Sequence, residues 1–279
     1  MIWLPGLWHG GPLILLSDFV TLRSFLPAAA LLLTTAATHS ALAQSAAGPE
    51  RRPRHYDKQG RLYYKGPVRF TLGGGVGYYN GDLTSSLGDQ FLGPSLSAGL
   101  LYQFHPHWQV GSEVSYLQLG AKDYLPDRGL AFRGNNAVGT AFVRWEPLRD
   151  PGAYSLPAGQ SAIIKPYFKT GVGLALYSPK AYRGTQRPSG NFTPAYLEPE
   201  RFDYPALALV LPIGVGVTIR LTSRLNATIE GTYSLTTTDQ LDDISTVPSP
   251  EFPMGRSASP LNDNYGQLEL KLEYAPWAR

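Results

Sequence analysis

LALVLPIGVGVTI, residues Leu207 to Ile219, alternates strictly between two kinds of side chain. One parity is branched aliphatic throughout, and the other is small or polar, ending at Thr218 and Arg220. A period of two predicts a β-strand with one apolar face and one small or polar face. The pattern recurs along the chain, and each copy is about as long as the ~9–11 residues with which a tilted β-strand crosses a bilayer.

Eight segments of this kind are expected. They are residues 68–80, 95–104, 108–120, 136–146, 163–177, 206–221, 225–238 and 265–274. Tighter links follow the second, fourth and sixth segments, and longer links follow the others, notably 178–205 and 239–264. The pattern predicts an all-β fold, an eight-stranded antiparallel up-and-down transmembrane β-barrel of the size of an OmpA-like membrane domain. Short turns and both termini are expected in the periplasm, with long loops outside.

Composition is consistent with such a barrel. The chain has 279 residues with 43% hydrophobic side chains, no cysteine and a formal net charge of +3. Helical membrane spans need about 20 unbroken apolar residues, whereas a barrel hides its membrane face in alternation. The small net charge, without a basic stripe carrying aromatics, argues against nucleic acid as a partner.

A soluble lipocalin-like barrel would show the same alternation with its faces exchanged. The polar face here is small or neutral, as at Thr71 and Gly73, where a water-facing exterior would be rich in Lys and Glu. The apolar face carries aromatic residues toward its ends, which suits the two interfacial girdles of a membrane barrel. The expected aromatic girdle is Phe70, Tyr78, Tyr102, Phe104, Trp108, Tyr116, Trp145, Tyr233 and Tyr274.

The same parity places charges of both signs in the lumen. The expected lumen charge network is Glu113, Arg144, Glu146, Lys169, Arg220, Glu230, Glu269, Lys271 and Glu273. Buried charges persist only when they are paired and hydrogen-bonded, so we predict a plugged polar lumen. The alternative is a proton or ion path through the same groups.

The N-terminus predicts export. Residues 1–43 form a signal peptide with an apolar run at 25–33 and a small-x-small cleavage site before Gln44, and residues 1–19 are interpreted as an over-extended start. Residues 44–66 form a basic segment expected to be flexible in the periplasm, and residues 67–279 form the barrel. The basic residues Arg51, Arg52, Arg54, Lys58 and Arg61 suit either an acidic partner or phosphate-bearing lipid, or simply a solvated tail.

Candidate chemistry is sparse. His105 and His107 could bind a metal, but two imidazoles in a tight turn fit a simple turn better. Asp239, Asp242 and Asp243 could coordinate calcium, but they lack the spaced oxygens of a calcium loop and fit solvated loop charges or strand-end caps better. We therefore predict a non-enzymatic protein with no catalytic residues, no cofactor and no metal.

Several stretches resemble the DUF6089 outer-membrane β-barrel family of Bacteroidetes-type bacteria. They are PVRFTLGGGVGYYNGDL from Pro67, PSLSAGLLYQFHPHWQVGSEVSYLQLGAKD from Pro94, KPYFKTGVGLALYSPKA from Lys165 and the stretch from Leu211 to Thr246. The most specific part is TDQLDDIS at 238–245, in which Asp239, Leu241, Asp242 and Asp243 match the family's T-D-Y-L-D-D-V-S. Gln240 departs from that pattern, and the chain continues to Arg279 beyond its last strand aromatic, either Tyr274 or Trp277.

The resemblance implies a fold and a location more than a reaction. Some relatives are accessory components of type IX secretion and gliding machinery, so a structural or accessory outer-membrane role is expected. The implied partners are outer-membrane lipid, the barrel-assembly machinery during biogenesis and secretion-machinery proteins. A small passive or gated pore, porin-like in character, is the alternative function.

Overall fold

The structure is a computed structural model. It describes residues 54–56, 58, 60, 62–63, 65–81, 83–124, 129–148, 163–189, 192–201, 203–244 and 262–276. The expected signal peptide at 1–43, the over-extended start at 1–19 and the terminal aromatic Trp277 lie outside the described residues. Among the described residues, no helix has the length and apolar character needed to cross a membrane.

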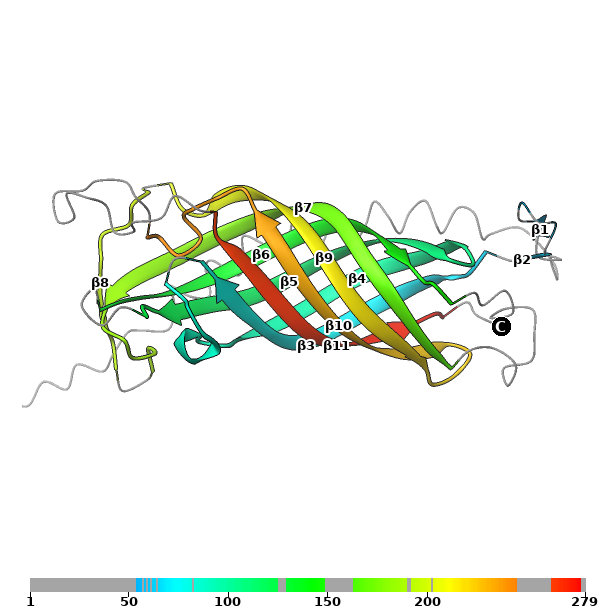
Figure 1. The fold of residues 1–279 in the computed structure, drawn as a ribbon, viewed down its shortest axis with the longest axis horizontal. Helices are drawn as coiled ribbons and strands as arrows, with labels where there is room; N and C mark the ends of the chain where they lie inside the picture. The colour runs from blue at the N-terminus through cyan, green and yellow to red at the C-terminus, as the bar shows by residue number, and fades with distance from the viewer. Residues whose placement is uncertain are drawn as a thin grey trace, which may run out of the picture. The chain divides into compact units, whose positions relative to one another are not determined.

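Eight long antiparallel strands close into a barrel, running obliquely around it (Figure 1). They are β3 (Val68–Asn80), β4 (Gly93–His105), β5 (Trp108–Lys122), β6 (Leu130–Trp145), β7 (Ile164–Arg183), β9 (Ala206–Arg220), β10 (Leu225–Thr236) and β11 (Asn264–Tyr274). Each barrel strand pairs with the next along the chain, and β3 pairs with β11 to close the sheet. The predicted eight-stranded up-and-down barrel is therefore confirmed.

Four short elements accompany the barrel strands in the described residues. They are β1 (His55–Tyr56), β2 (Leu62–Tyr63), the 3₁₀ helix η1 (Leu87–Asp89) and β8 (Ala195–Tyr196). The β1–β2 pair lies in the segment 44–66, where no regular structure was expected. β8 pairs with the end of β7. We call the barrel end with the turns at 106–107 and 221–224 the short-turn end, and the opposite end the long-loop end.

Two strands extend six residues beyond their predicted bounds, more than any other barrel strand does. β6 begins at Leu130, six residues before the expected residue 136, and β7 continues to Arg183 instead of ending at 177. The two strands stay paired over this extension, from Asn135–Ser178 to Leu130–Arg183. The apolar alternation on the outer face stops at Asn135 and Ser178, so the sequence pattern ends before the backbone ladder does.

The barrel is apolar outside, and its lumen is polar except toward the long-loop end, where Leu117, Leu119 and Phe132 belong to a buried apolar cluster. The branched aliphatic residues of β9 face outward, with Leu207, Ile213 and Val215 all exposed, while the alternate residues of this strand face the lumen. Leu270 on β11 is 66% exposed. Since a soluble barrel needs the opposite arrangement, the lipocalin-like alternative is wrong.

Candidate functional site

The candidate functional site is the lumen, into which all eight barrel strands project charged or hydroxyl side chains, six of them in its central layer. The central layer consists of Glu113 from β5, Arg144 from β6, Tyr167 and Lys169 from β7, Glu230 from β10, and Glu269, Lys271 and Glu273 from β11, with Ser95 and Ser97 from β4. We use the term central layer for this set below. All of its charged side chains are at most 10% exposed.

Two lysines hold three carboxylates together at the middle of this layer. Lys271 Nζ lies 2.5 Å from Glu113, 2.7 Å from Glu230 and 3.1 Å from Glu269. Lys169 Nζ lies 3.1 Å from Glu113 and 2.8 Å from Glu230. Because both ammonium groups share Glu113 and Glu230, the four side chains form a closed ring of ion pairs across the lumen.

Arg144 extends the ring toward the short-turn end. It donates to Glu273 at 2.7 Å and to Glu230 at 3.4 Å. Its guanidinium lies 3.9 Å from the centre of the Tyr167 ring, and the Tyr167 hydroxyl donates to Glu230 at 2.6 Å. Thr228 also donates to Glu273, at 3.1 Å. Each charge in this part of the lumen therefore has several partners, the condition under which buried charges are tolerated.

Glycines on the neighbouring strands leave room for these long side chains. A Cβ on Gly73 would lie 2.7 Å from Cγ of Lys271, its partner across the β3–β11 ladder. A Cβ on Gly216 would lie 2.4 Å from the Tyr167 ring. At Gly73 and Gly216, therefore, the absence of a side chain leaves room for a long lumen side chain in a narrow barrel.

One group of described carboxylates comes close enough to hold a metal ion. Ligand oxygens of Glu113, Glu230 and Glu269 lie within 4.8 Å of one another. Lys271 Nζ bonds to all three, so an ammonium group already occupies the position that a cation would take. The chemistry available to this arrangement is charge neutralisation across the lumen.

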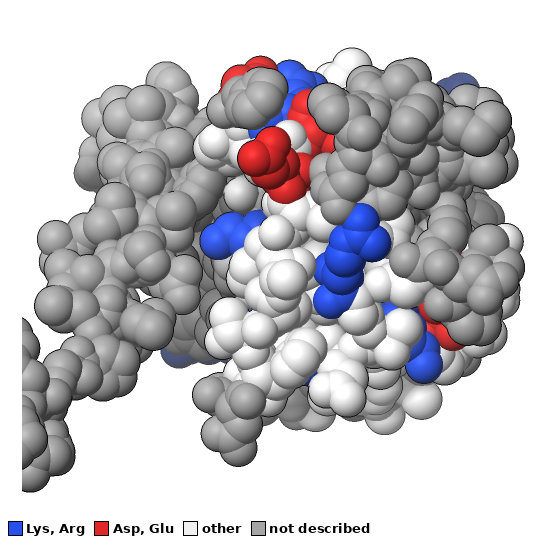
Figure 2. Space-filling model, turned by 90° about the vertical axis from the view of Figure 1, so that its left-hand side faces the viewer, with Lys and Arg blue, Asp and Glu red and all other residues white. Residues whose placement is uncertain are grey.

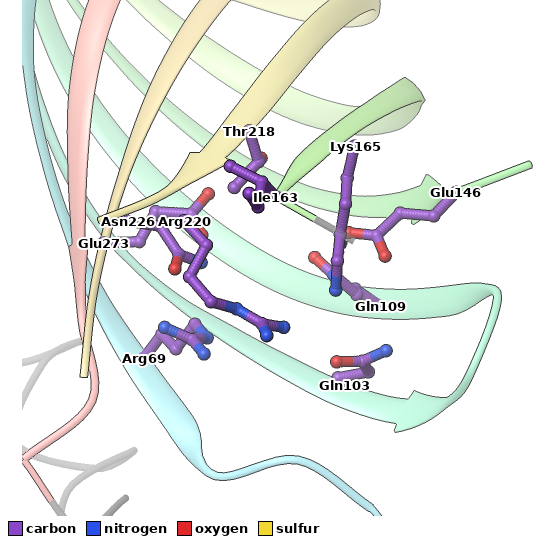
Figure 3. Close-up of a pocket in the computed structure, with 10 residues that line it drawn as sticks. All are labelled: Arg69, Gln103, Gln109, Glu146, Ile163, Lys165, Thr218, Arg220, Asn226 and Glu273. Atoms are coloured by element: carbon purple, nitrogen blue, oxygen red, sulfur yellow. Dashed lines mark hydrogen bonds between the residues drawn. The ribbon is translucent and has the colours of Figure 1, made fainter. Parts of the chain in front are cut away.

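The other two predicted network members, Glu146 and Arg220, do not join the central layer. They line a cavity at the short-turn end together with Arg69 and Lys165 (Figure 3). Gln109 Nε2 donates to Glu146 at 2.5 Å. The cavity measures about 20 Å³, which is room for about one water molecule. Strand parity placed Glu146 and Arg220 inside, but it could not place them at a different depth from the rest.

The segment that carries the family-like motif packs into the long-loop end of the barrel. Leu241 and Ile244 are 1% exposed and pack with Tyr79 in one apolar cluster. Asp242 is fully buried and accepts a hydrogen bond from Tyr79 at 2.7 Å. The Tyr79 hydroxyl also lies within hydrogen-bond distance of Asp263.

These contacts overturn the expectation that Asp242 and Asp243 are solvated loop charges. Asp243 is 1% exposed and accepts from the Tyr204 hydroxyl and from the Glu200 amide, both at 2.9 Å. Its backbone φ of 61° lies in the left-handed region, which Asp tolerates better than most residues. Burial, reinforced by the neighbouring Asp243 carboxylate, raises the pKa of the Tyr204 phenol above its ordinary value. Asp239 is only partly exposed.

All nine predicted girdle aromatics lie on the outward face of the barrel, and they form two groups. Phe70, Tyr102, Phe104, Trp108, Trp145 and Tyr274 lie toward the short-turn end, and Tyr78, Tyr116 and Tyr233 lie toward the long-loop end. The Trp145 ring lies 5.7 Å from that of Phe168, an outward residue that the sequence analysis missed. A Tyr or Trp ring with one apolar side and one polar tip suits a boundary between hydrocarbon and headgroups.

His105 and His107 form hydrogen bonds at the turn between β4 and β5. The His107 amide donates to His105 Nδ1 at 3.3 Å, and His107 Nδ1 lies 2.8 Å from the Glu146 carbonyl oxygen. These contacts account for the ring orientation of both histidines.

Sequence reasoning missed Arg69, Lys165, Tyr79, Tyr167 and Asp263. Arg69 and Lys165 carry a signal, since both have the inward parity of their strands. Tyr79 and Tyr167 share that inward parity, but it does not reveal their partners, which lie on strands distant in the sequence, and Asp263 precedes its strand and gave no signal.

Fold and surface together define a class, the closed eight-stranded antiparallel barrels of the outer-membrane type. No family model matches the chain, and no curated protein matches its sequence, so the DUF6089 resemblance stays a prediction.

Similar solved structures include Neisserial surface protein A, with 12% identity, 76% of this chain and 98% of that chain covered, and a TM-score of 0.40. The outer membrane protein OprG from Pseudomonas aeruginosa has 12% identity, coverage of 76% and 97%, and a TM-score of 0.36. The outer membrane enzyme PagL has 11% identity, coverage of 73% and 98%, and a TM-score of 0.32. Likenesses this distant transfer no activity to this chain.

Proposed function

We propose that this chain is a non-enzymatic integral outer-membrane β-barrel with a plugged lumen, acting as a structural or accessory protein. The supporting observation is the ring formed by Lys169, Lys271, Glu113 and Glu230, which joins strands on opposite sides of the lumen. The apolar outer face, bounded at both ends by aromatic residues, supports the membrane location.

Conductance separates this proposal from the alternative of a small pore. The chain from Gln44 is folded in detergent, its heat-dependent mobility on a cold denaturing gel is checked, and it is inserted into a planar bilayer. A plugged barrel shows a mobility shift with β-rich circular dichroism and no conductance steps. Reproducible steps from the heat-modifiable species would overturn the plugged lumen and favour the pore.

Leu270→Arg tests whether the outer face of the barrel lies in lipid. Leu270 lies midway along β11, and an arginine at the bilayer midplane costs about 2–4 kcal/mol in a membrane barrel. We expect that loss in the free energy of unfolding from lipid vesicles, measured by urea titration. The matched control is Asn135→Arg, an exposed outward position on the β6 extension, where the cost should be about 0–1 kcal/mol. Equal losses at the two positions would contradict a membrane-embedded belt.

The accessory role in type IX secretion or gliding, and the periplasmic placement of the termini, are proposed on the sequence alone. Cross-linking in intact cells followed by purification of the heat-modifiable barrel tests the first. Accessibility of a cysteine in the turn at 221–224 to a membrane-impermeant reagent tests the second. Labelling in intact cells would reverse the orientation.

A further inference from the structure

The outer face of strands β5, β6 and β7 changes character sharply toward the long-loop end. On β6 the outward residues are apolar or small from Trp145 to Ala137, followed by Asn135 and then Arg133. On β7 they run through Val172, Leu174 and Leu176 to Ser178 and then Lys180. On β5 the outward residue nearest this end is Lys122. Each of three adjacent strands therefore passes from an uncharged outer face to a cation.

The three cations are neighbours. Arg133 pairs directly with Lys180 across the β6–β7 ladder, and Lys122 pairs with Ala131, two residues from Arg133. Arg133 and Lys180 are exposed, and neither forms an ion pair with a carboxylate of the described residues. Along β5, β6 and β7 the one acidic residue is Glu113, and it points into the lumen. We call Lys122, Arg133 and Lys180 the outer cationic ledge.

The position of the ledge along the strands matches a headgroup region. Tyr116, at the edge of the aromatic group, is paired with Ala137, which is paired with Leu176. Arg133 and Lys180 each lie four residues farther out along their strands. At about 3.3 Å per residue and a tilt near 40°, this places them about 10 Å above the aromatic level. A cation at that height sits beside lipid headgroups.

A cleft adjoins the ledge. It measures about 250 Å³ and is lined by Arg133 together with Phe192, Pro194 and Tyr196 of the loop after β7. β8 holds this loop against β7, where the Tyr196 ring lies 6.0 Å from that of Tyr182. Arg187, also exposed, belongs to the same loop. Figure 2 looks onto this end of the barrel, where Lys and Arg side chains stand among uncharged residues and Asp and Glu side chains gather mainly in the upper part of the view.

We propose that the outer cationic ledge binds the phosphate groups of a phosphorylated glycolipid in the surrounding outer leaflet, with the cleft at Arg133 taking part of its sugar headgroup. The inference rests on the proposed outer-membrane location, because the ledge meets headgroups only if the apolar belt lies in a bilayer. Arginine and lysine are the side chains suited to phosphate oxygens, and the cleft offers hydroxyls and ring faces for a sugar.

The test measures binding of bisphosphorylated lipid A to the folded chain by native mass spectrometry from detergent. Binding is compared with dephosphorylated lipid A and with phosphatidylcholine. Folding is first verified for every variant by the heat-dependent gel shift. Arg133→Gln combined with Lys180→Gln should weaken binding of the bisphosphorylated lipid about five-fold for each charge removed, and binding of phosphatidylcholine should be unchanged.

The matched control removes two charges elsewhere, with Lys65→Gln and Arg224→Gln at the short-turn end, and should leave lipid A binding unchanged. Equal loss in the control, or equal binding of the dephosphorylated lipid, would overturn the ledge as a phosphate site. Displacement of the lipid by millimolar inorganic phosphate would assign the site to free phosphate instead and would also overturn the proposal. A wild-type chain that shows no gel shift would contradict the proposed membrane barrel itself. This outcome distinguishes failure of the proposed function from failure of the lipid-binding proposal.

Discussion

The central layer and the short-turn end use the same residue types in opposite ways. In the central layer, four carboxylates meet three cations, and Lys271 alone contacts three of the carboxylates. At the short-turn end, Arg69, Lys165 and Arg220 surround one small cavity with Glu146 and with Glu273, which is the member of the central layer that borders it. The first arrangement excludes water, and the second has room for it. Charge in a narrow lumen therefore acts as a cross-link where it is dry and as a lining where water can enter.

The largest effect is expected in the central layer. Glu230→Gln weakens the contacts of Lys169, Lys271 and Arg144 at once, and breaking a buried ion pair from one side costs about 3–5 kcal/mol. We expect a loss of that size in the free energy of unfolding, followed by tryptophan fluorescence during urea titration in lipid vesicles.

A second variant keeps this test informative if Glu230→Gln fails to fold. Adding Lys169→Met to Glu230→Gln removes one charge of each sign, so the double variant should be more stable than the single one. A double variant that is less stable than Glu230→Gln alone would contradict the Lys169–Glu230 ion pair as the contact whose loss destabilises the single variant.

A smaller effect is expected at the short-turn end. Lys165 lines the cavity. If its ammonium group is removed, water in the cavity can form hydrogen bonds with the polar groups that remain. Lys165→Gln should lower the free energy of unfolding by about 1–2 kcal/mol, in the same assay. If its effect matched or exceeded that of Glu230→Gln, the distinction between dry and wet layers would be wrong.

The smallest effect is expected in the loops, at the hydrogen bond between Tyr204 and Asp243. Tyr204 donates to Asp243, and burial raises the pKa of Tyr204 above its value in the unfolded chain. A raised pKa means that its contribution to stability is fully present below about pH 10 and is lost as the pH rises through the folded pKa.

Tyr204→Phe should therefore cost about 0.5–1 kcal/mol at pH 7, and progressively less as the pH rises above about 10, where the phenol of the unfolded chain ionises. The ultraviolet titration of wild type minus variant should show one phenol ionising later than an ordinary tyrosine. A difference spectrum with an ordinary ionisation midpoint near pH 10 would contradict the Tyr204–Asp243 contact.

Strand number, parity and the apolar outer face could be predicted because they depend on local alternation. β3 spans Val68–Asn80, the same residues that the pattern indicated, because its outward residues stay apolar almost to its end. The extensions of β6 and β7 could not be found this way, since Arg133 and Lys180 interrupt the apolar pattern while the backbone pairing continues.

The site was predictable only as far as a single strand can show it. Parity placed all nine network residues in the lumen, but the separation of Glu146 and Arg220 from the central layer depends on how strands distant in sequence are staggered. The burial of Asp242 likewise depends on Tyr79, 163 residues away along the chain. Such contacts are decided by closure of the sheet, which no local pattern records.

Closure also links the two ends of the barrel sequence, because the ladder that closes the sheet joins β3 to β11 through eleven residue pairs. The entropy of closing the longest loop must therefore be overcome before the hydrogen bonds of this ladder form. β11 also supplies Glu269, Lys271 and Glu273. A chain lacking its final strand thus has an open edge on β3 and a lumen in which Glu113 and Glu230 have lost Lys271. The last strand therefore completes the sheet and the central layer at the same time.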